Sequence, residues 1–197
     1  VPNEGKTFIS ANMAISFASL GKKVVVVGAD IRNPELTSFF GESKTKGLST
    51  YLSSSDMKID SLIRTTQYDN LDFISAGPVP PNSTELLSLP RWDDLIDELK
   101  KRYDYVLIDS APVAVVSDTL VLGRVADLTV LVFRANSSNK NWFKTINELS
   151  ETGKLKNMAV VVNFVEENVG SLAYGEQRYG YGYGYGYGAG YGHGNKK

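Results

Sequence analysis

The chain has 197 residues, of which 42% are hydrophobic and 22% are charged, an ordinary composition for one globular domain. Its formal net charge of -1 gives no electrostatic reason to expect nucleic acid as the main partner, and without cysteine it has neither disulfides nor thiolate metal sites. No apolar run approaches the roughly 20 residues that span a bilayer, so we expect a soluble domain in a reducing cytoplasm.

The chain opens on a loop followed by a helix. Residues 2–7 read Pro-Asn-Glu-Gly-Lys-Thr, and a helix is predicted over residues 8–20. The loop matches the second half of the phosphate-binding pattern G-x-x-x-x-G-K-[ST], whose first glycine would fall one position before Val1. In such a loop backbone amides hold phosphate, Lys6 neutralises phosphate oxygens and Thr7 ligates Mg²⁺, although short patterns also match by chance. We expect the chain to be part of a longer protein.

An acidic motif follows the first predicted strand, residues 23–27. The segment 28–34 reads Gly-Ala-Asp-Ile-Arg-Asn-Pro, which places Asp30 at the carboxyl end of the strand and Arg32 just after it. Because parallel strands present their carboxyl ends to the ligand, Asp30 is a candidate site residue.

Further strands and helices alternate along the chain. Strands are predicted over residues 71–75, 103–109, 128–133 and 158–164, and helices over residues 83–100, 116–123 and 139–151. The strands are short runs of Val, Ile, Leu and aromatic residues, typical of strands buried on both faces. The pattern predicts an α/β fold, a doubly wound and mostly parallel sheet with helices on both faces.

A second acid ends the predicted strand 103–109. Asp109 follows Tyr-Val-Leu-Ile and precedes Ser-Ala-Pro, an arrangement in which the carboxylate holds Mg²⁺, usually through water. A solvated aspartate at a strand end is the alternative. Together, Lys6, Thr7, Asp30 and Asp109 supply the lysine, hydroxyl and carboxylates that phosphoryl transfer requires.

The composition changes after Gly170 to a tyrosine- and glycine-rich segment that cannot build a core. We therefore divide the chain into a domain over 1–169 and a mobile tail over 170–197. The tail tyrosines are Tyr174, Tyr179, Tyr181, Tyr183, Tyr185, Tyr187 and Tyr191. Such a segment suits a flexible substrate, and an adhesive low-complexity tail is the alternative.

These motifs resemble those of the bacterial tyrosine kinases, or BY-kinases, of capsular and exopolysaccharide synthesis, which are related to the MinD and ParA ATPases. The resemblance covers nearly the whole chain. It rests on the Lys6 loop, the Asp30 and Asp109 motifs and the tyrosine cluster, together with Gly-Leu-Ser-Thr-Tyr-Leu at 47–52 and Gly-Pro-Val-Pro-Pro-Asn-Ser-Thr-Glu-Leu-Leu at 77–87.

The resemblance implies an ATP- and Mg²⁺-dependent protein-tyrosine kinase with the P-loop fold of MinD. It implies autophosphorylation of the tail tyrosines in trans within a ring-shaped homo-oligomer, often an octamer. Its implied partners are a membrane chain-length regulator, fused upstream or separate, and a cognate tyrosine phosphatase, with no nucleic acid. The implied location is the cytoplasmic face of the bacterial cell membrane.

Site residues follow from the same resemblance by matching position. The implied catalytic residues are Lys6, Asp30, Arg32 and Asp109; the nucleotide-binding residues are Asn3, Glu4, Gly5, Lys6, Thr7, Phe8 and Asn163; and the metal ligands are Thr7, Asp30 and Asp109. Asn163 stands where the family contacts adenine, and a buried strand-end amide is an equal alternative.

One position departs from the family pattern. The second acidic motif usually reads Asp-x-Asp-x-Arg, and here Gly28 replaces the first aspartate. This departure leaves open a catalytically weak ATP-binding regulator of polysaccharide export. A separate alternative is an ATPase switch similar to MinD or ParA. Against the switch, the chain lacks the basic amphipathic C-terminal helix that membrane docking would require.

Overall fold

The computed structural model describes residues 4–40, 46–112, 118–136, 141–152, 155 and 157–165, which lie within one compact unit. None of the helices in these ranges has the length and hydrophobicity needed to cross a bilayer.

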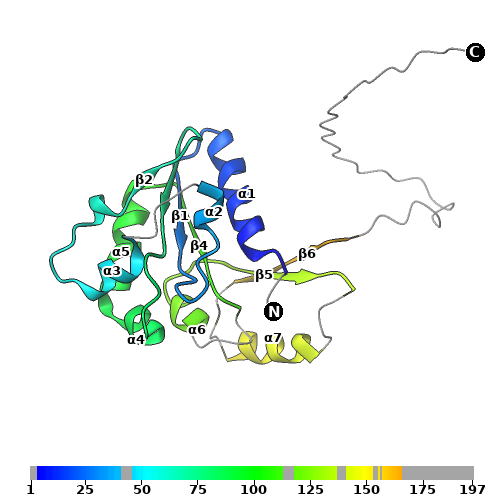
Figure 1. The fold of residues 1–197 in the computed structure, drawn as a ribbon. Helices are drawn as coiled ribbons and strands as arrows, with labels where there is room; N and C mark the ends of the chain where they lie inside the picture. The colour runs from blue at the N-terminus through cyan, green and yellow to red at the C-terminus, as the bar shows by residue number, and fades with distance from the viewer. Residues whose placement is uncertain are drawn as a thin grey trace, which may run out of the picture. The chain divides into compact units, whose positions relative to one another are not determined.

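Four strands form the main sheet (Figure 1). They are β1 (Val24–Gly28), β2 (Arg64–Thr65), β3 (Leu71–Ile74) and β4 (Tyr105–Asp109), in the order β2-β3-β1-β4. Strand β1 is parallel to both β3 and β4, and β2 is antiparallel to β3. In this register Gly28 lies opposite Asp109, so the two acidic motifs leave the sheet side by side.

Alternate residues of β1 belong to the two cores on the opposite faces of this sheet. Val24 and Val26 pack with helix α1 (Lys6–Ser19), whereas Val25 and Val27 pack in the core that holds helix α5 (Pro90–Arg102). All four valines are fully buried, and each such side chain contributes about 1.5–3 kcal/mol. The predicted mostly parallel α/β fold with helices on both faces is confirmed.

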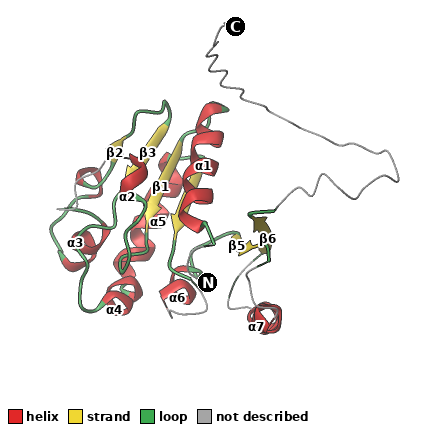
Figure 2. Cartoon of the chain, turned by 45° about the vertical axis from the view of Figure 1, so that its right-hand side comes forward, coloured by secondary structure: helices red, strands yellow, loops and turns green. Residues whose placement is uncertain are grey.

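The remaining strands form a separate pair. Strand β5 (Thr129–Arg134) is parallel to β6 (Met158–Asn163). Figures 1 and 2 show this pair to one side of the main sheet, with α7 (Asn141–Glu151) close to it. Among the described residues, no strand joins β4 to β5 by hydrogen bonds, so this pair stands apart from the four-stranded sheet.

The predicted helix 83–100 is two helices, α4 (Ser83–Ser88) and α5. The break falls at Leu89, which is extended with ψ 146° and precedes Pro90, the first residue of α5. A residue before proline avoids the helical region, and proline at a first helical position loses no needed hydrogen bond. Helix α6 (Asp118–Leu122) lies within the predicted helix 116–123.

Short elements between β1 and β3 were not predicted. They are α2 (Thr37–Phe40), α3 (Leu48–Ser53), the 3₁₀ turn η1 (Ile59–Ser61) and β2. Gly47 lies so close to the exit of β3 that a Cβ atom would be 2.4 Å from the Gly77 nitrogen. The Leu48 amide donates to the Ser75 oxygen at 2.8 Å. The two glycine motifs at 47–52 and 77–87 thus meet each other and brace the loop after β3.

Candidate functional site

The phosphate-binding loop leads directly into α1. Gly5 has φ 86°, a left-handed conformation that favours glycine, and its oxygen accepts the first helical bond from the Ile9 amide at 2.9 Å. Lys6 and Thr7 follow in the first turn, where helix amides point out of the N-terminus and favour an anion. The loop therefore has the local conformation that a phosphate requires.

The amide of Asn163 holds this loop from the end of β6. Its Nδ2 donates to the Glu4 oxygen at 3.1 Å, and a Cβ atom on Gly5 would lie 2.4 Å from the same nitrogen. Phe164 follows Asn163, with the Arg134 guanidinium 4.3 Å from its ring centroid. Asn163 is thus a part-buried strand-end amide bonded to the loop, which is one of the two roles considered for it.

Asp109 lies at the centre of the site, at the end of β4. It is 3% exposed, and the Ser10 hydroxyl donates to its Oδ1 at 3.2 Å. Burial raises the pKa of its carboxyl to about 6, against the opposing effects of hydrogen bonds from Thr7 and Ser10. The nearby Asp30 charge raises this pKa further, and Lys6 lowers it. A buried carboxylate with such neighbours is suited to a cation.

Backbone hydrogen bonds hold the Asp30 segment next to Asp109. The amides of Ala29 and Asp30 both donate to the Asp109 oxygen, at 2.8 and 3.0 Å. The Asp30 side chain is positioned by the Asn33 amide, which donates to Oδ1 at 3.0 Å. Burial raises the pKa of Asp30, and backbone hydrogen bonds and the Lys6 charge lower it. Both carboxyls therefore share the field of one lysine.

These contacts bring together four predicted residues from three elements, namely Lys6 and Thr7 of α1, Asp30 after β1 and Asp109 of β4. The side chains of two other predicted residues also make contacts outside this group. Arg32 is exposed and donates to Thr84 Oγ1 at 2.9 Å, on α4. Phe8 is 56% exposed, and its ring lies edge-on to that of Phe39, with ring centroids 6.4 Å apart.

Some predicted residues lie outside the part of the chain that the structure describes. They are Asn3 and the tail tyrosines Tyr174, Tyr179, Tyr181, Tyr183, Tyr185, Tyr187 and Tyr191.

Sequence reasoning missed Ser10. It lies three residues after Thr7, on the same face of α1, and the helical spacing could have revealed it. In the described chain no cluster of three or more His, Cys, Asp or Glu side chains forms a ready metal cage.

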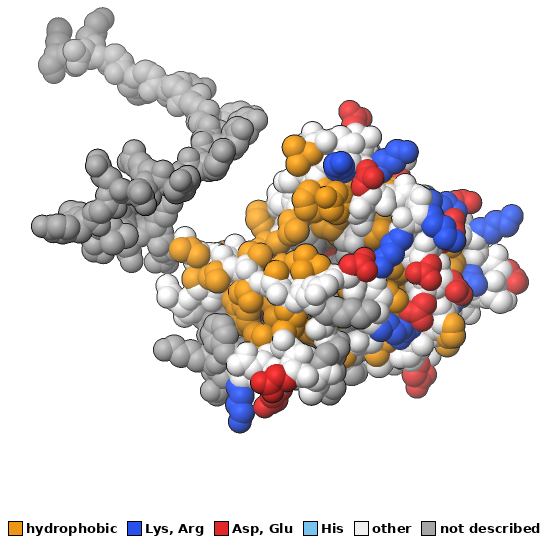
Figure 3. Space-filling view, turned by 180° about the vertical axis from the view of Figure 1, so that it is seen from behind, with side chains coloured by type: hydrophobic (Ala, Val, Ile, Leu, Met, Phe, Trp, Pro, Cys, Tyr) orange, Lys and Arg blue, Asp and Glu red, His pale blue; other side chains and the backbone are white. Residues whose placement is uncertain are grey.

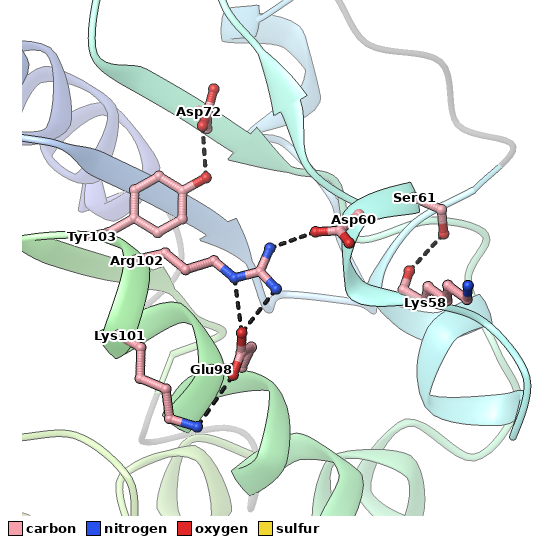
Figure 4. Close-up of polar contacts among 8 residues, drawn as sticks. All are labelled: Lys58, Asp60, Ser61, Asp72, Glu98, Lys101, Arg102 and Tyr103. Atoms are coloured by element: carbon pink, nitrogen blue, oxygen red, sulfur yellow. Dashed lines mark hydrogen bonds and ion pairs between the residues drawn. The ribbon is translucent and has the colours of Figure 1, made fainter.

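A second polar cluster lies at the C-terminal end of α5 (Figure 4). Arg102 pairs with Asp60 and, at 2.8 Å, with Glu98, and the Tyr103 hydroxyl donates to Asp72 Oδ2 at 2.6 Å. Burial raises the pKa of Tyr103, and the hydrogen bond to Asp72 raises it further. Since β4 begins just after Tyr103 and ends at Asp109, this cluster lies at the other end of the strand and ties α5 to η1 and β3.

Comparison with known proteins decides the family. A sequence profile of the AAA domain matches residues 4–158. The chain is 36% identical over 163 residues to the tyrosine-protein kinase YwqD of Bacillus subtilis, covering 82% of this chain and 68% of that protein. The chain belongs to the bacterial tyrosine-protein kinase family. Its resemblance to capsule and exopolysaccharide kinases, expected from the motifs, is confirmed.

Another relative is much longer than this chain. The chain is 38% identical over 185 residues to the putative tyrosine-protein kinase EpsB of Ralstonia solanacearum, covering 91% of this chain but only 24% of that protein. The chain thus spans about a quarter of the length of this relative.

Solved structures agree with the family. The kinase domain of the Escherichia coli tyrosine kinase ETK has a TM-score of 0.79 and 31% identity, over 93% of this chain and 69% of that one. MinD of Pyrococcus horikoshii, solved with Mg-ADP, has a TM-score of 0.67 at 20% identity over 82% of this chain and 66% of that one, and shows the fold alone. The shared fold is that of P-loop nucleotide-binding proteins.

Proposed function

We propose that this domain is an ATP-dependent protein-tyrosine kinase that phosphorylates the tyrosine cluster of its own tail in trans. The observation that carries the proposal is the meeting of Lys6, Thr7, Asp30 and Asp109 at the start of α1 and the ends of β1 and β4. Family membership supplies the reaction class. The site supplies the cation, hydroxyl and carboxylates which that class requires.

Bound Mg-ATP would supply the phosphoryl group and a cation that withdraws charge from the phosphate oxygens. Lys6 and the loop amides would bind those oxygens, and Thr7 and Asp109 would orient the metal. Since the Asp109 pKa is about 6, its carboxyl is mostly ionised at neutral pH and is buried as an anion at a free-energy cost. A bound cation would offset that cost, so folding and metal binding support each other.

Asp30 would bind the metal or help to deprotonate the attacking tyrosine. A phenol has a pKa of about 10, so a nearby carboxylate can assist its ionisation only as the proton leaves in the transition state. Burial raises the Asp30 pKa and makes it a better proton acceptor than a solvated aspartate. Its backbone bond from Asn33 fixes the direction of the carboxylate.

The remaining assignments follow from the family. We place the catalytic domain at 1–169 and the autophosphorylated tail at 170–197. Each phosphate would add about -1.5 to -2 charge, so several on one tail would repel one another and the carboxylates of a neighbouring site. Multiple phosphorylation would therefore release the tail and dissolve a ring-shaped oligomer. A membrane chain-length regulator and a tyrosine phosphatase are the partners that such a cycle requires, at the inner face of the cell membrane.

Gly28 favours one rival, a catalytically weak ATP-binding regulator. It ends β1 directly before Ala29 and Asp30, and a Cβ atom there would lie 3.3 Å from the Ala76 nitrogen. The backbone after β3 therefore packs against the position where relatives carry a carboxylate. We favour the kinase because Asp30 and Asp109 already give the two carboxylates that Mg²⁺ commonly uses.

Incubation with Mg-ATP and mapping of phosphotyrosine by mass spectrometry tests the proposal. We expect label on the tail tyrosines and its loss in Lys6→Met, whereas Arg102→Gln, at the other end of β4, should label normally. Hydrolysis of ATP without phosphotyrosine would favour a MinD-like switch. Nucleotide binding with neither label nor hydrolysis would favour the regulator.

A further inference from the structure

Two phenylalanine rings lie open to solvent beside the nucleotide site. Phe8 follows Thr7 in the first turn of α1 and is 56% exposed, and Phe39 of α2 is 39% exposed. Their ring centroids are 6.4 Å apart and their ring planes meet at 61°, an edge-on arrangement. Aromatic side chains gain free energy from burial, so this Phe8–Phe39 pair is a candidate contact surface for a ligand.

The packing of the segment around α2 explains why Phe39 lies at the surface. Leu36 is 2% exposed and packs with α1 and β1 in the core on one face of the sheet. Phe40 packs against Phe73 of the same core, with ring centroids 5.1 Å apart. Residues four apart on a helix lie on the same face, so Leu36 and Phe40 both face the core. These two anchors hold α2 in place and leave Phe39 outside.

A series of hydrogen bonds connects Phe39 to the Asp30 carboxyl. The Asn33 amide donates to Asp30 Oδ1 at 3.0 Å, and the Glu35 amide donates to the Asn33 oxygen at 2.9 Å. The Ser38 amide in turn donates to the Glu35 oxygen at 3.1 Å. Phe39 is the next residue, so its ring and the Asp30 carboxylate belong to one braced loop.

Exposure alone does not mark a binding site on this molecule. Apolar side chains also gather on the face seen in Figure 3, and Val162 of β6 is 54% exposed. The Phe8–Phe39 pair differs because its rings come from the two segments that also carry Lys6 and Asp30. A ligand held by the pair would therefore be bound by the same segments that act on the phosphate and the proton.

We propose that the Phe8–Phe39 pair binds the phenol ring of the acceptor tyrosine, and that this tyrosine belongs to the tail of a second copy of the chain. The inference rests on the proposed kinase function and adds how the site selects tyrosine. A phenol ring can stack on the two phenyl rings or meet them edge-on, whereas a serine side chain has no ring to bury. Glycines beside the tail tyrosines have no Cβ atom, so the backbone can approach the pair closely.

The spacing of the tail tyrosines fits one recognition element that is used repeatedly. From Tyr179 to Tyr187 every second residue is tyrosine. Residues two apart in an extended segment point to the same side and lie about 6.6 Å apart. A shift of the bound segment by two residues would bring the next tyrosine to the pair in the same orientation. One site can therefore serve several acceptors.

The adenine ring of the nucleotide is the competing occupant, since it is also aromatic. The acceptor ring fits better because Phe39 is braced to Asp30, the carboxylate that would take the phenol proton. The nucleotide and acceptor readings differ in which affinity depends on Phe39.

Binding of an acceptor peptide tests the inference without catalysis. The receptor is the 197-residue chain with its seven tail tyrosines replaced by serine, so that it offers no competing phenol. The probe is a fluorescently labelled peptide of residues 174–191, made once with tyrosine and once with serine at those seven positions. Fluorescence anisotropy should show tighter binding of the tyrosine peptide. Phe39→Ala in the receptor should reduce this preference about five-fold, the loss expected of an aromatic contact.

Two matched variants control for a general effect of the substitution. Phe39→Trp keeps an aromatic ring and should retain the preference for the tyrosine peptide. Leu20→Ala removes a 75% exposed apolar side chain at the far end of α1 and should leave the preference unchanged. With Mg-ATP present, Phe39→Ala should raise the KM for the tyrosine peptide by a similar factor and leave the KM for ATP unchanged.

The same measurements can overturn the inference. A receptor that binds both peptides equally, or a preference that survives Phe39→Ala, would overturn it, whether or not the peptide is phosphorylated. A raised KM for ATP in place of the raised KM for the peptide would assign the pair to adenine and would also overturn it. Binding that depends on Phe39 without any phosphotyrosine would support the docking surface and contradict the proposed kinase function, so the two proposals can fail independently.

Discussion

Replacing Asp109 by asparagine is expected to stabilise the magnesium-free protein at neutral pH. Burial raises the pKa of this carboxyl from 3.8 to about 6, so the folded state holds the anion at a cost. A difference of about two pKa units corresponds to about 2–3 kcal/mol at about 1.36 kcal/mol per unit. Asparagine removes the charge and keeps an oxygen that can accept the Ser10 hydroxyl, so most of this free energy should be recovered.

The effect has a defined pH dependence. The folded state binds the Asp109 proton more tightly than the unfolded state does. The stability of the wild type is therefore highest below about pH 4, and it falls as the pH rises from there to about 6. The Asp109→Asn protein lacks this fall. The two stability curves should therefore meet at acid pH and separate above it.

Urea unfolding, followed by the fluorescence of the buried Trp92, measures this difference from about pH 4 to about pH 8. Added Mg²⁺ with nucleotide should stabilise the wild type and not Asp109→Asn. The exposed Asp97→Asn serves as the control and should leave the pH dependence unchanged. An Asp109→Asn protein that is less stable than the wild type at neutral pH would refute the reasoning.

Three further substitutions test other parts of the structure. Gly28→Asp should lower the free energy of unfolding at neutral pH, because it buries another carboxylate beside the site and its Cβ would lie 3.3 Å from the Ala76 nitrogen. Urea unfolding at neutral and acid pH would measure the loss, and an unchanged midpoint would contradict the prediction. Asn163→Leu should weaken nucleotide binding, because the phosphate loop loses the 3.1 Å hydrogen bond to the Glu4 oxygen, which is worth about 1 kcal/mol or roughly five-fold in affinity. Calorimetry would measure the affinity, and an unaltered value would show that Asn163 does not contribute to the nucleotide site. Thr129→Val should raise the free energy of unfolding of the chain by about 1 kcal/mol, because the buried Thr129 hydroxyl has no hydrogen-bond partner. A lowered urea midpoint would show instead that this hydroxyl makes a hydrogen bond.

The site was predictable because its signals are local. Asp30 and Asp109 each end a short hydrophobic run, and parallel strands bring such ends to one edge of a sheet. The loop conformation at Gly5 and the helix after it are likewise encoded within a few neighbouring residues. The meeting of these residues with Lys6 was therefore predictable from local motifs and the general geometry of parallel α/β sheets.

Other features depend on pairings that no local pattern reveals. The separation of β4 from β5 is a matter of which strand edges meet, and both strands have the hydrophobic composition expected of one sheet. The short helix α3 is fixed by the close approach of Gly47 to Gly77, which are far apart in the sequence. The break before Pro90 was the exception, since the proline itself marks it.

Phosphotyrosine mapping after incubation with Mg-ATP tests the central claim most directly. It should be carried out on the 197-residue chain, with Lys6→Met as the matched variant. The account predicts phosphate on tyrosines of the tail and none in the Lys6→Met protein. Absence of phosphotyrosine from the chain, or equal label in the Lys6→Met protein, would contradict it.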